Sequence, residues 1–284
     1  MSEESDFRKI EELIKSFIDE AHLELKERWE KWTIDLSQNE IHEVIGALLA
    51  RQVTLATQMA QCPPIWNGHI APIILRAMAD VFISFAWVLK DPLERSRKFI
   101  LYGLGQAVLQ LDHFKAQIVG REPTSKEKML IEASEAWINS QRFTFLTDVN
   151  VGSWSGIPTR QMAEEAGCVD FYNYVYNPFS ACAHSMWHHV AKYNLRQCAN
   201  PLHQYHQVPT DPDFPIDPHN FYLAGKYLEK TFRAFDNEFS IQVDAPSAYK
   251  HLCKRLDKLS AASNGESESG KTAENTEPGA TADR

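Results

Sequence analysis

The chain has 284 residues, of which 44% are hydrophobic and 24% are charged. This balance is typical of a folded globular protein and excludes a fibrous or fully disordered one. The formal charge of -9 at pH 7 argues against non-specific coating of nucleic acid or anionic membrane, because both depend on a basic surface. Five scattered cysteines without a C-x-x-C pair, and an acidic start without an apolar leader, predict a cytoplasmic protein without disulfides.

Helical signals follow one another along the chain, and no segment alternates apolar and polar residues as a half-buried strand does. The apolar spacing, the capping residues and the prolines predict helices over residues 5–29, 37–61, 70–90, 91–120, 124–138, 160–166, 170–194, 217–235 and 246–259. We therefore expect an all-α multi-helix bundle in one domain over residues 1–259. Residues 260–284 hold no large apolar side chain and are predicted to form a disordered acidic tail.

Two helix starts have the spacing of a capping box. Ser37 with Glu40, and Thr124 with Glu127, each place a hydroxyl three residues before a carboxylate. In that arrangement the two side chains bind each other's backbone N–H groups. Both pairs are ordinary helix boundaries and indicate no function.

The apolar segment over residues 70–89 is long enough to cross a membrane, but it contains Pro72, Arg76 and Asp80. Two charges near the centre of a membrane helix cost about 2.5 to 3.5 kcal/mol each, so we expect a central core helix and no membrane contact. Arg76 and Asp80 are four residues apart and share one helix face. We expect both side chains in the interior, unless that face is the one side of the helix exposed to water. They form either an ordinary intrahelical ion pair or, since burying a charge pair seldom adds stability, a functional site.

A second group of candidates follows a step of four residues: Tyr172, Tyr176, Ser180 and His184, with His188 one step further. Adjacent members share a helix face, although the whole run drifts around the helix. The run predicts either one side of a cleft or an aromatic core stripe with a serine bound to its own backbone. Pro178 lies inside this helix and should kink it, because proline donates no backbone hydrogen bond.

Histidines and cysteines are dense over one stretch, which holds Cys182, His184, His188, His189, Cys198, His203 and His206. His184 and His188 are spaced to share a metal ion, and Cys198 and His203 could complete a tetrahedral zinc site. The alternative is a set of surface histidines without metal. Motifs for phosphate loops, nucleophile elbows, zincins and di-iron bundles are absent from the sequence, so we expect no cofactor.

Four segments stand in a distinctive order: ARQVTLATQM, ILRAMADVFISFAWVLKDPLERSRKFILYG, WSGIPTRQMAEEAG and YNYVYNPFSACAHS. Over roughly residues 45–195 they resemble a widespread bacterial helical family of unknown function. The resemblance implies one pocket built from an Arg-x-x-x-Glu helix, a W-x-G turn and a Tyr-x-x-x-Tyr-x-x-x-Ser-x-x-x-His helix. The matching positions are Arg76, Asp80, Trp154, Tyr172, Tyr176, Ser180 and His184, with Arg51 a weaker match; Asp80 stands where the family has glutamate.

A looser likeness is to the HEPN helical proteins, several of which are metal-independent ribonucleases with an arginine four to six residues before a histidine on one helix. Here Arg196 precedes His203 by seven residues, and Pro201 interrupts the segment. Arg76 would therefore have to supply the guanidinium from another helix. The likeness implies cleavage of RNA by attack of its 2′-hydroxyl.

The sequence supports two main functions. In the favoured one, the protein is a non-catalytic module that binds a protein partner, a second copy of itself or a small anionic ligand, and the charged residues clasp helices together. In the other, it is a ribonuclease of a bacterial defence or toxin-like system, in which Arg76 holds a phosphate, His184 transfers protons and Asp80 orients one of them. Zinc binding is a third alternative.

Overall fold

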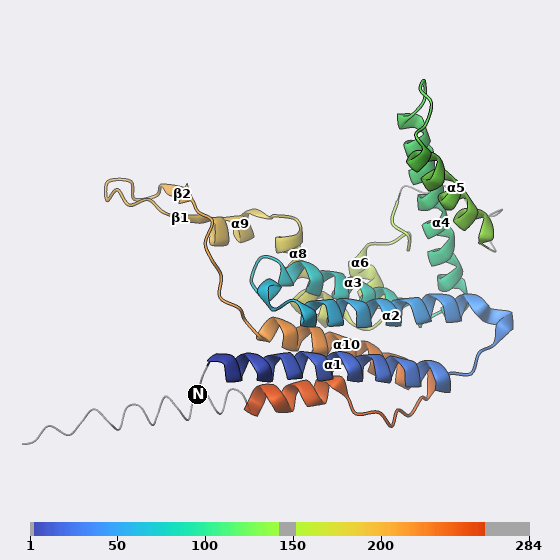
Figure 1. Ribbon diagram of the computed structural model, residues 1–284, viewed down its shortest axis with the longest axis horizontal. Helices are drawn as coiled ribbons and strands as arrows, with labels where there is room; N and C mark the ends of the chain where they lie inside the picture. Colours follow the sequence, from blue (N-terminus) through green and yellow to red (C-terminus); the bar gives the residue numbers. More distant parts are fainter. Residues whose placement is uncertain (1–2, 142–151, 259–284) are drawn as a thin grey trace, which may run out of the picture.

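The computed structural model describes residues 3–141 and 152–258 (Figure 1). Its elements are α1 (Glu3–Lys31), η1 (Leu36–Gln38), α2 (Asn39–Gln61), η2 (Pro63–Ile65), α3 (Ala71–Val88), α4 (Pro92–Gln117), α5 (Ser125–Ser140), α6 (Thr159–Glu165), α7 (Val169–Phe171), the π-helical turn η4 (Tyr172–Tyr176), α8 (Asn177–Ala183), α9 (Trp187–Asn194), β1 (Leu195–Gln197), β2 (Gln207–Pro209) and α10 (His219–Phe239), followed by a helix over 248–258. The expected all-α fold is confirmed. The tail predicted over 260–284 lies outside the described residues.

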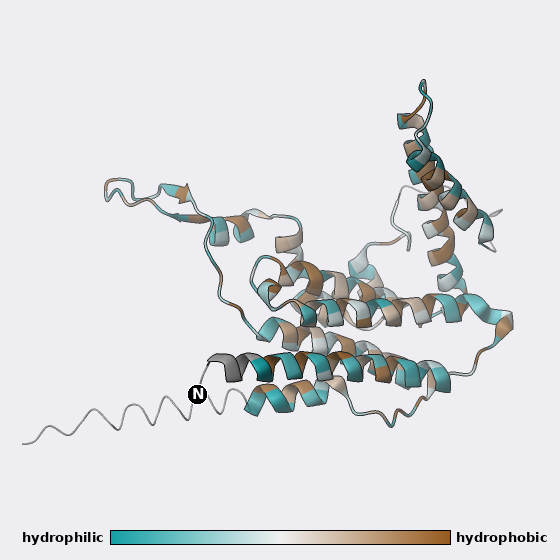
Figure 2. Ribbon diagram, viewed as in Figure 1, coloured by the Kyte–Doolittle hydropathy of each residue, from teal (hydrophilic) through white to brown (hydrophobic). Residues whose placement is uncertain are grey.

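The body of the molecule is a bundle of long helices. Helices α1, α2 and α10 lie side by side in Figure 1, and α3 packs against both α2 and α10. Brown apolar faces of these helices alternate with teal polar ones in Figure 2, as expected for amphipathic helices around a shared core. The largest fully buried side chains include Phe17, Ile45, Leu49, Met59, Leu75, Met78, Ile83, Phe85, Phe221, Phe232 and Phe235.

Helix α3 is apolar and long enough to cross a membrane by length and composition, yet half of it is buried inside the protein. It contacts α2, α10, α6, η4 and α8. These contacts make α3 the central core helix that the sequence predicts. A cytoplasmic location stays a prediction. All five cysteines are free, in agreement with the expected absence of disulfides.

A buried ionic network joins α1 to α10. The Arg28 guanidinium donates two hydrogen bonds to the Asp236 carboxylate, both of 2.8 Å, and lies 3.9 Å from the centre of the Phe232 ring. Glu24, one turn earlier on α1, accepts a hydrogen bond of 3.0 Å from the backbone N–H of Ala248. Because Arg28 and Glu24 are each only 3% exposed, this network fixes how α1, α10 and the helix over 248–258 meet.

The two predicted capping boxes have different outcomes. At α5 the box is confirmed, since Thr124 and Glu127 exchange both expected hydrogen bonds. At α2 it is wrong: Asp35 accepts from the backbone of Ser37 and caps the short turn η1 instead. Glu40 is 1% exposed and forms an ion pair of 3.1 Å with Arg97 of α4, so tertiary packing takes the carboxylate away from the helix start.

The helix predicted over 170–194 is divided in the structure. After α8, His184, Ser185 and Met186 form a helix end in which Ser185 has a φ of 49°. The N–H of Met186 reaches the carbonyl of Ala181 (2.9 Å) and the N–H of Ser185 that of Cys182 (3.1 Å), the bonding pattern of a Schellman motif. The chain therefore turns before α9, and the prediction of one continuous helix is wrong.

A small hairpin follows α9; its first strand precedes the loop predicted over 199–218 and its second strand lies inside it. Strands β1 and β2 are antiparallel, with Gln197 opposite Gln207. In Figure 1 this hairpin extends away from the bundle, as does the pair formed by α5 and the far end of α4. The periodicity argument misses strands of three residues because so short a segment has no readable alternation.

The buried carboxyl of Glu24 gives a pH dependence of stability. Burial raises its pKa from 4.5 to about 7, against the opposing effect of its hydrogen bond from Ala248. The folded state therefore binds this proton more tightly than the unfolded state, so Glu24 destabilises the fold progressively as the pH rises from about 4.5 through 7. At about 1.4 kcal/mol per pKa unit, the loss approaches about 3 kcal/mol by pH 8.

Urea unfolding of the wild type and Glu24→Gln at several pH values measures this effect. We expect the free energy of unfolding of the wild type to fall relative to that of the variant between about pH 5 and 8. Glu30→Gln, which changes an exposed carboxylate of the same helix, serves as control and should differ from the wild type by less than about 0.5 kcal/mol throughout. Parallel pH profiles of the wild type and Glu24→Gln would contradict the prediction.

Candidate functional site

Arg76 of α3 lies at the centre of a polar cluster that joins α3 to α8. Its Nε donates to the hydroxyl of Ser180 (2.7 Å), its Nη1 pairs with Asp80, and its guanidinium lies 3.2 Å from the centre of the Tyr176 ring. Tyr172 stacks on Tyr176 with ring centres 4.8 Å apart. The structure therefore brings four of the predicted site residues together around the guanidinium of a fifth, Arg76.

The π-helical turn η4 makes this convergence of side chains possible. Pro178 has no N–H to donate to the preceding turn, and the backbone N–H of Asn177 reaches back to the carbonyl of Tyr172, one residue further than in an α-helix. The wider turn changes the angular spacing of Tyr172 and Tyr176, so both rings stack on the same side. The predicted irregularity at Pro178 is present as this wide turn.

The burial of the ion pair differs between its two members. The Arg76 side chain is 11% exposed, whereas that of Asp80 is 48% exposed. Of the two expected positions, interior or wet stripe, Arg76 therefore takes the first and Asp80 the second. Burial lowers the pKa of Arg76, and the nearby Tyr176 and Tyr172 oppose that shift.

His184 does not join this cluster. Helix α8 runs antiparallel to α3, since Cys182 donates to the carbonyl of His69 (3.0 Å) while Ser180 meets Arg76. His184 is therefore displaced toward the beginning of α3, away from Asp80. Its side chain is exposed and makes no hydrogen bond to another described residue. The ribonuclease hypothesis requires Arg76, Asp80 and His184 at one reacting centre. The catalytic role of these residues stays a prediction, and so does the likeness to HEPN proteins.

Trp154 and Arg51 lie elsewhere. Trp154 is half-buried, and its ring packs edge-on against Trp87 (5.3 Å) and Phe99 (4.8 Å). Trp87 is three turns from Arg76 along α3, about 16 Å. Trp154 therefore anchors the loop before α6 rather than lining a pocket with Arg76. Arg51 is exposed on α2.

The predicted zinc ligands also lie in two separate places. Cys198 and His203 come together, with Sγ and Nδ1 3.7 Å apart, and His206 joins them. His184 and His188 are not members of this group. They lie before and within α9, while the others lie in the loop between β1 and β2.

A cavity of about 620 Å³ opens where the beginnings of α3 and α10 meet α8 and α9. Phe179, Tyr193 and Phe214 supply aromatic walls, while His188, His189, Lys192, His219 and Asn220 supply polar groups. The backbone N–H of Asp217 donates to the carbonyl of Trp66 (2.7 Å) and so places the start of α10 beside that of α3. We refer to this cavity as the histidine pocket.

The polar groups of the histidine pocket are mainly basic. Burial, and then the neighbouring His69, His188 and Lys192, lower the pKa of His189. Lys192 forms no ion pair with a described carboxylate, and its Nζ lies 4.9 Å from the Tyr193 ring. Sequence reasoning missed Lys192 and His219, because the loop over 199–218 separates them. The one sequence signal for this pocket was the predicted helix start at Asp217-Pro218, because the N-terminal end of a helix favours anions.

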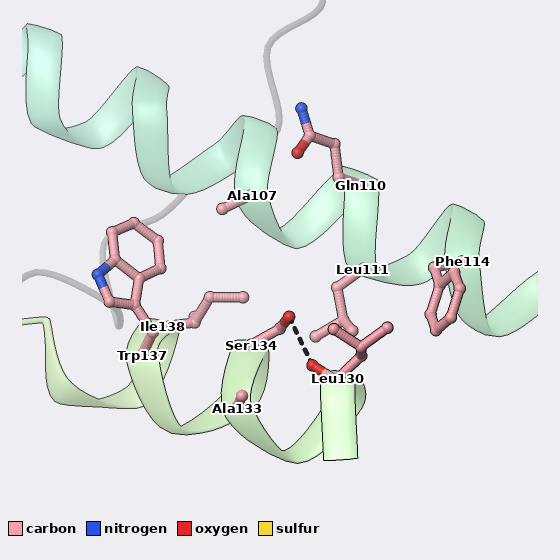
Figure 3. Close-up of a pocket in the computed structure, with 9 residues that line it drawn as sticks. All are labelled: Ala107, Gln110, Leu111, Phe114, Leu130, Ala133, Ser134, Trp137 and Ile138. Atoms are coloured by element: carbon pink, nitrogen blue, oxygen red, sulfur yellow. Dashed lines mark hydrogen bonds between the residues drawn. The ribbon is translucent and has the colours of Figure 1, made fainter. Parts of the chain in front are cut away.

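A second cavity, of about 660 Å³, lies between α4 and α5. Figure 3 shows Leu111 and Phe114 of α4 facing Leu130, Trp137 and Ile138 of α5 across it. Trp137 is 53% exposed and Leu130 is 46% exposed. This surface is apolar and lies outside the main core. We call it the hairpin groove, after the helical hairpin that α4 and α5 form, which is distinct from the β1–β2 hairpin.

Substitutions separate a clasp at Arg76 from an open binding site. We expect Arg76→Ala to lower the free energy of unfolding by about 1 to 3 kcal/mol, because it removes a charge-assisted hydrogen bond and a cation–π contact. Asp80→Asn should cost less than about 1 kcal/mol, since Asp80 is half exposed. Arg51→Ala, the exposed control, should stay within about 0.5 kcal/mol of the wild type. Chemical denaturation measures all three, and equal effects of Arg76→Ala and Arg51→Ala would rule out the clasp.

Comparison with known protein families gives a match, whereas comparison with individual proteins does not. No curated protein and no solved structure matches the chain. Residues 42–200, more than half of the chain, match a family described as a family of unknown function (DUF5677). These bounds agree closely with the resemblance predicted over 45–195. The chain therefore belongs to the DUF5677 family.

Proposed function

We propose that the protein is a non-catalytic binding module for a small anionic ligand, and that the histidine pocket is its binding site. The observation that carries the proposal is the meeting of basic side chains from two distant segments, His188, His189 and Lys192 of α9 with His219 of α10, around one cavity. Its volume of about 620 Å³ lies within the range of about 300 to 1,000 Å³ that is usual for small-molecule sites.

The charge of the pocket favours an anion. Lys192 lacks a carboxylate partner among the described residues, and the first turn of α10 adds the positive end of a helix of 21 residues. The carboxylate of Asp217 is also at the rim, but it accepts the backbone N–H of His219 (2.9 Å). An anionic group that enters the pocket would therefore meet basic groups on α9 and donors at the start of α10.

The apolar walls of the pocket favour a ring attached to the anionic group. Tyr193 and Phe214 lie edge to face, with ring centres 5.4 Å apart, and the His69 ring packs edge-on against both of them. Aromatic walls bind the faces or edges of planar rings. A nucleoside monophosphate combines a planar base with a phosphate and is the appropriate probe of this ligand class.

Titration calorimetry with adenosine monophosphate tests the proposal. We expect saturable binding, weakened about five- to tenfold by Lys192→Ala, because a charge-assisted contact is lost. Lys226→Ala on the exposed side of α10 removes the same charge away from the pocket and should leave the affinity unchanged. Adenosine and inorganic phosphate, titrated alone, report the ring and the anion separately. Absence of binding, or equal affinities of the two lysine variants, would reject the histidine pocket as the site.

Relative to the variant His189→Asn, binding should also strengthen as the pH falls from 8 to 6; this comparison cancels the titration of the phosphate itself, whose second pKa is about 6. An anion favours the protonated form of His189, whose pKa is lowered by burial and by the neighbouring positive groups, so ligand binding takes up a proton. The other titratable groups that line the pocket are Cys182, His188, Lys192, Tyr193, Asp217 and His219, and His69 contacts His189 from outside the lining. His189→Asn should flatten the pH dependence of the affinity, and an unchanged slope would remove His189 from the site.

The hairpin groove favours a second candidate function, self-association. A single pair of packed helices leaves its apolar groove open to solvent. Two α4–α5 helix pairs can pack into a four-helix bundle that covers the groove of each copy. A two-fold contact of this kind uses the same surface on each copy. We therefore propose a homodimer through the hairpin groove.

Light scattering coupled to size-exclusion chromatography tests the dimer over a range of protein concentrations. We expect a dimer that the double variant Leu130→Ser with Trp137→Ser converts to a monomer, because both side chains line the groove. Val119→Ser is the control, since Val119 is 81% exposed near the turn of the same hairpin and does not line the groove. A monomeric wild type, or a dimer that survives the double variant, would exclude this interface.

A further inference from the structure

The loop between β1 and β2 brings together three side chains that bind transition metals. The ligand atoms of Cys198, His203 and His206 all lie within 4.8 Å of one another. With Zn–N bonds of about 2.1 Å and Zn–S bonds of about 2.3 Å, neighbouring ligand atoms of a tetrahedral site lie roughly 3.4 to 3.6 Å apart. The Cys198 Sγ to His203 Nδ1 distance of 3.7 Å is close to this value.

The backbone of the hairpin explains why these three residues meet. The N–H of Cys198 donates to the carbonyl of His206 (3.0 Å), which extends the β1–β2 ladder and places the two residues opposite each other. Two successive turns, from Asn200 to His203 and from His203 to His206, each closed by a backbone hydrogen bond of 3.0 Å, fold the intervening loop back over the ladder. These turns bring the His203 side chain back beside that of Cys198.

Further contacts orient the ligands from outside. The backbone N–H of Asn200 points at the Cys198 sulfur (3.5 Å), an interaction that favours a thiolate. The side chain of Asn200 meets His203 Nε2 (3.3 Å) and so leaves Nδ1 directed at Cys198. Gln197 donates to the carbonyl of Gln204 (2.9 Å) and braces the loop. Partners of this kind hold metal ligands in position.

The hairpin has little other means of holding its shape. Each strand has three residues, and a two-stranded hairpin is at best marginally stable in water. The large apolar side chains of the loop are exposed, Leu202 at 88% and Tyr205 at 92%, so they form no core under it. A bound metal ion would supply the missing stabilisation, as it does in small domains without a sufficient core.

We infer that Cys198, His203 and His206 form a zinc site at the tip of the β1–β2 hairpin. One thiolate and two imidazoles are ligands suited to Zn²⁺ and unsuited to Mg²⁺ or Ca²⁺. Binding forms one Zn–S and two Zn–N bonds and releases the Cys198 thiol proton to solvent. Water fills the fourth position. The site uses none of the residues of the histidine pocket, and it replaces the predicted ligands His184 and His188 with His206.

Metal analysis and Zn²⁺ titration of the full chain, purified without a histidine tag, test this site. We expect one Zn²⁺ per chain, with the affinity lowered by more than about 100-fold in Cys198→Ser and in the double variant His203→Ala with His206→Ala, since loss of an outer partner alone costs about 10- to 100-fold. The double variant His184→Ala with His188→Ala is the matched control and should bind as the wild type does.

Substitution with Co²⁺ identifies the sulfur ligand. We expect a thiolate-to-cobalt charge-transfer band that Cys198→Ser abolishes and Cys62→Ser retains. Unfolding measured with EDTA present should be the same for the wild type and all ligand variants, because the hairpin lies outside the core. A zinc content near zero, or Zn²⁺ affinity that the ligand variants leave unchanged, would overturn the inference, as would loss of binding in the His184 and His188 control.

Discussion

A guanidinium on the apolar core helix imposes a constraint on the middle of this protein. Arg76 is almost buried on α3, and a charge removed from water must find partners within the protein. Asp80 supplies one from the wet side of the same helix, while Ser180 and Tyr176 supply the others from a different segment. The requirement is met only when α8 lies antiparallel along α3.

The placement of α8 determines where the remaining polar groups gather. Once Ser180 is held at Arg76, Cys182 reaches the carbonyl of His69 at the start of α3, and the Schellman end at Ser185 turns the chain into α9. His188, His189 and Lys192 are thereby brought to the beginning of α10. The histidine pocket is thus a consequence of the clasp, even though Arg76 itself does not line it.

The residues that the sequence motifs emphasise are therefore not the ones that line the proposed ligand sites. The Arg-x-x-x-Asp helix and the Tyr-x-x-x-Tyr-x-x-x-Ser run are the most conspicuous patterns, and in the structure they satisfy one another. Groups available for ligands lie at helix ends and on the two extensions seen in Figure 1. A buried polar side chain must be paired to be tolerated, whereas a binding group must be left accessible, so the two roles seldom coincide.

The sequence by itself determined the helical class, most helix boundaries and the central position of α3, because these follow from apolar periodicity, capping residues and prolines within one segment. It also identified Arg76, Asp80, Tyr172, Tyr176 and Ser180 as candidates to lie together. Only the tertiary structure decided that His184 lies outside this cluster, that Glu40 pairs with Arg97, and that His206 joins Cys198 and His203. Such outcomes depend on contacts between segments far apart in the chain and on turns of a few residues, and neither leaves a periodic signal in the sequence.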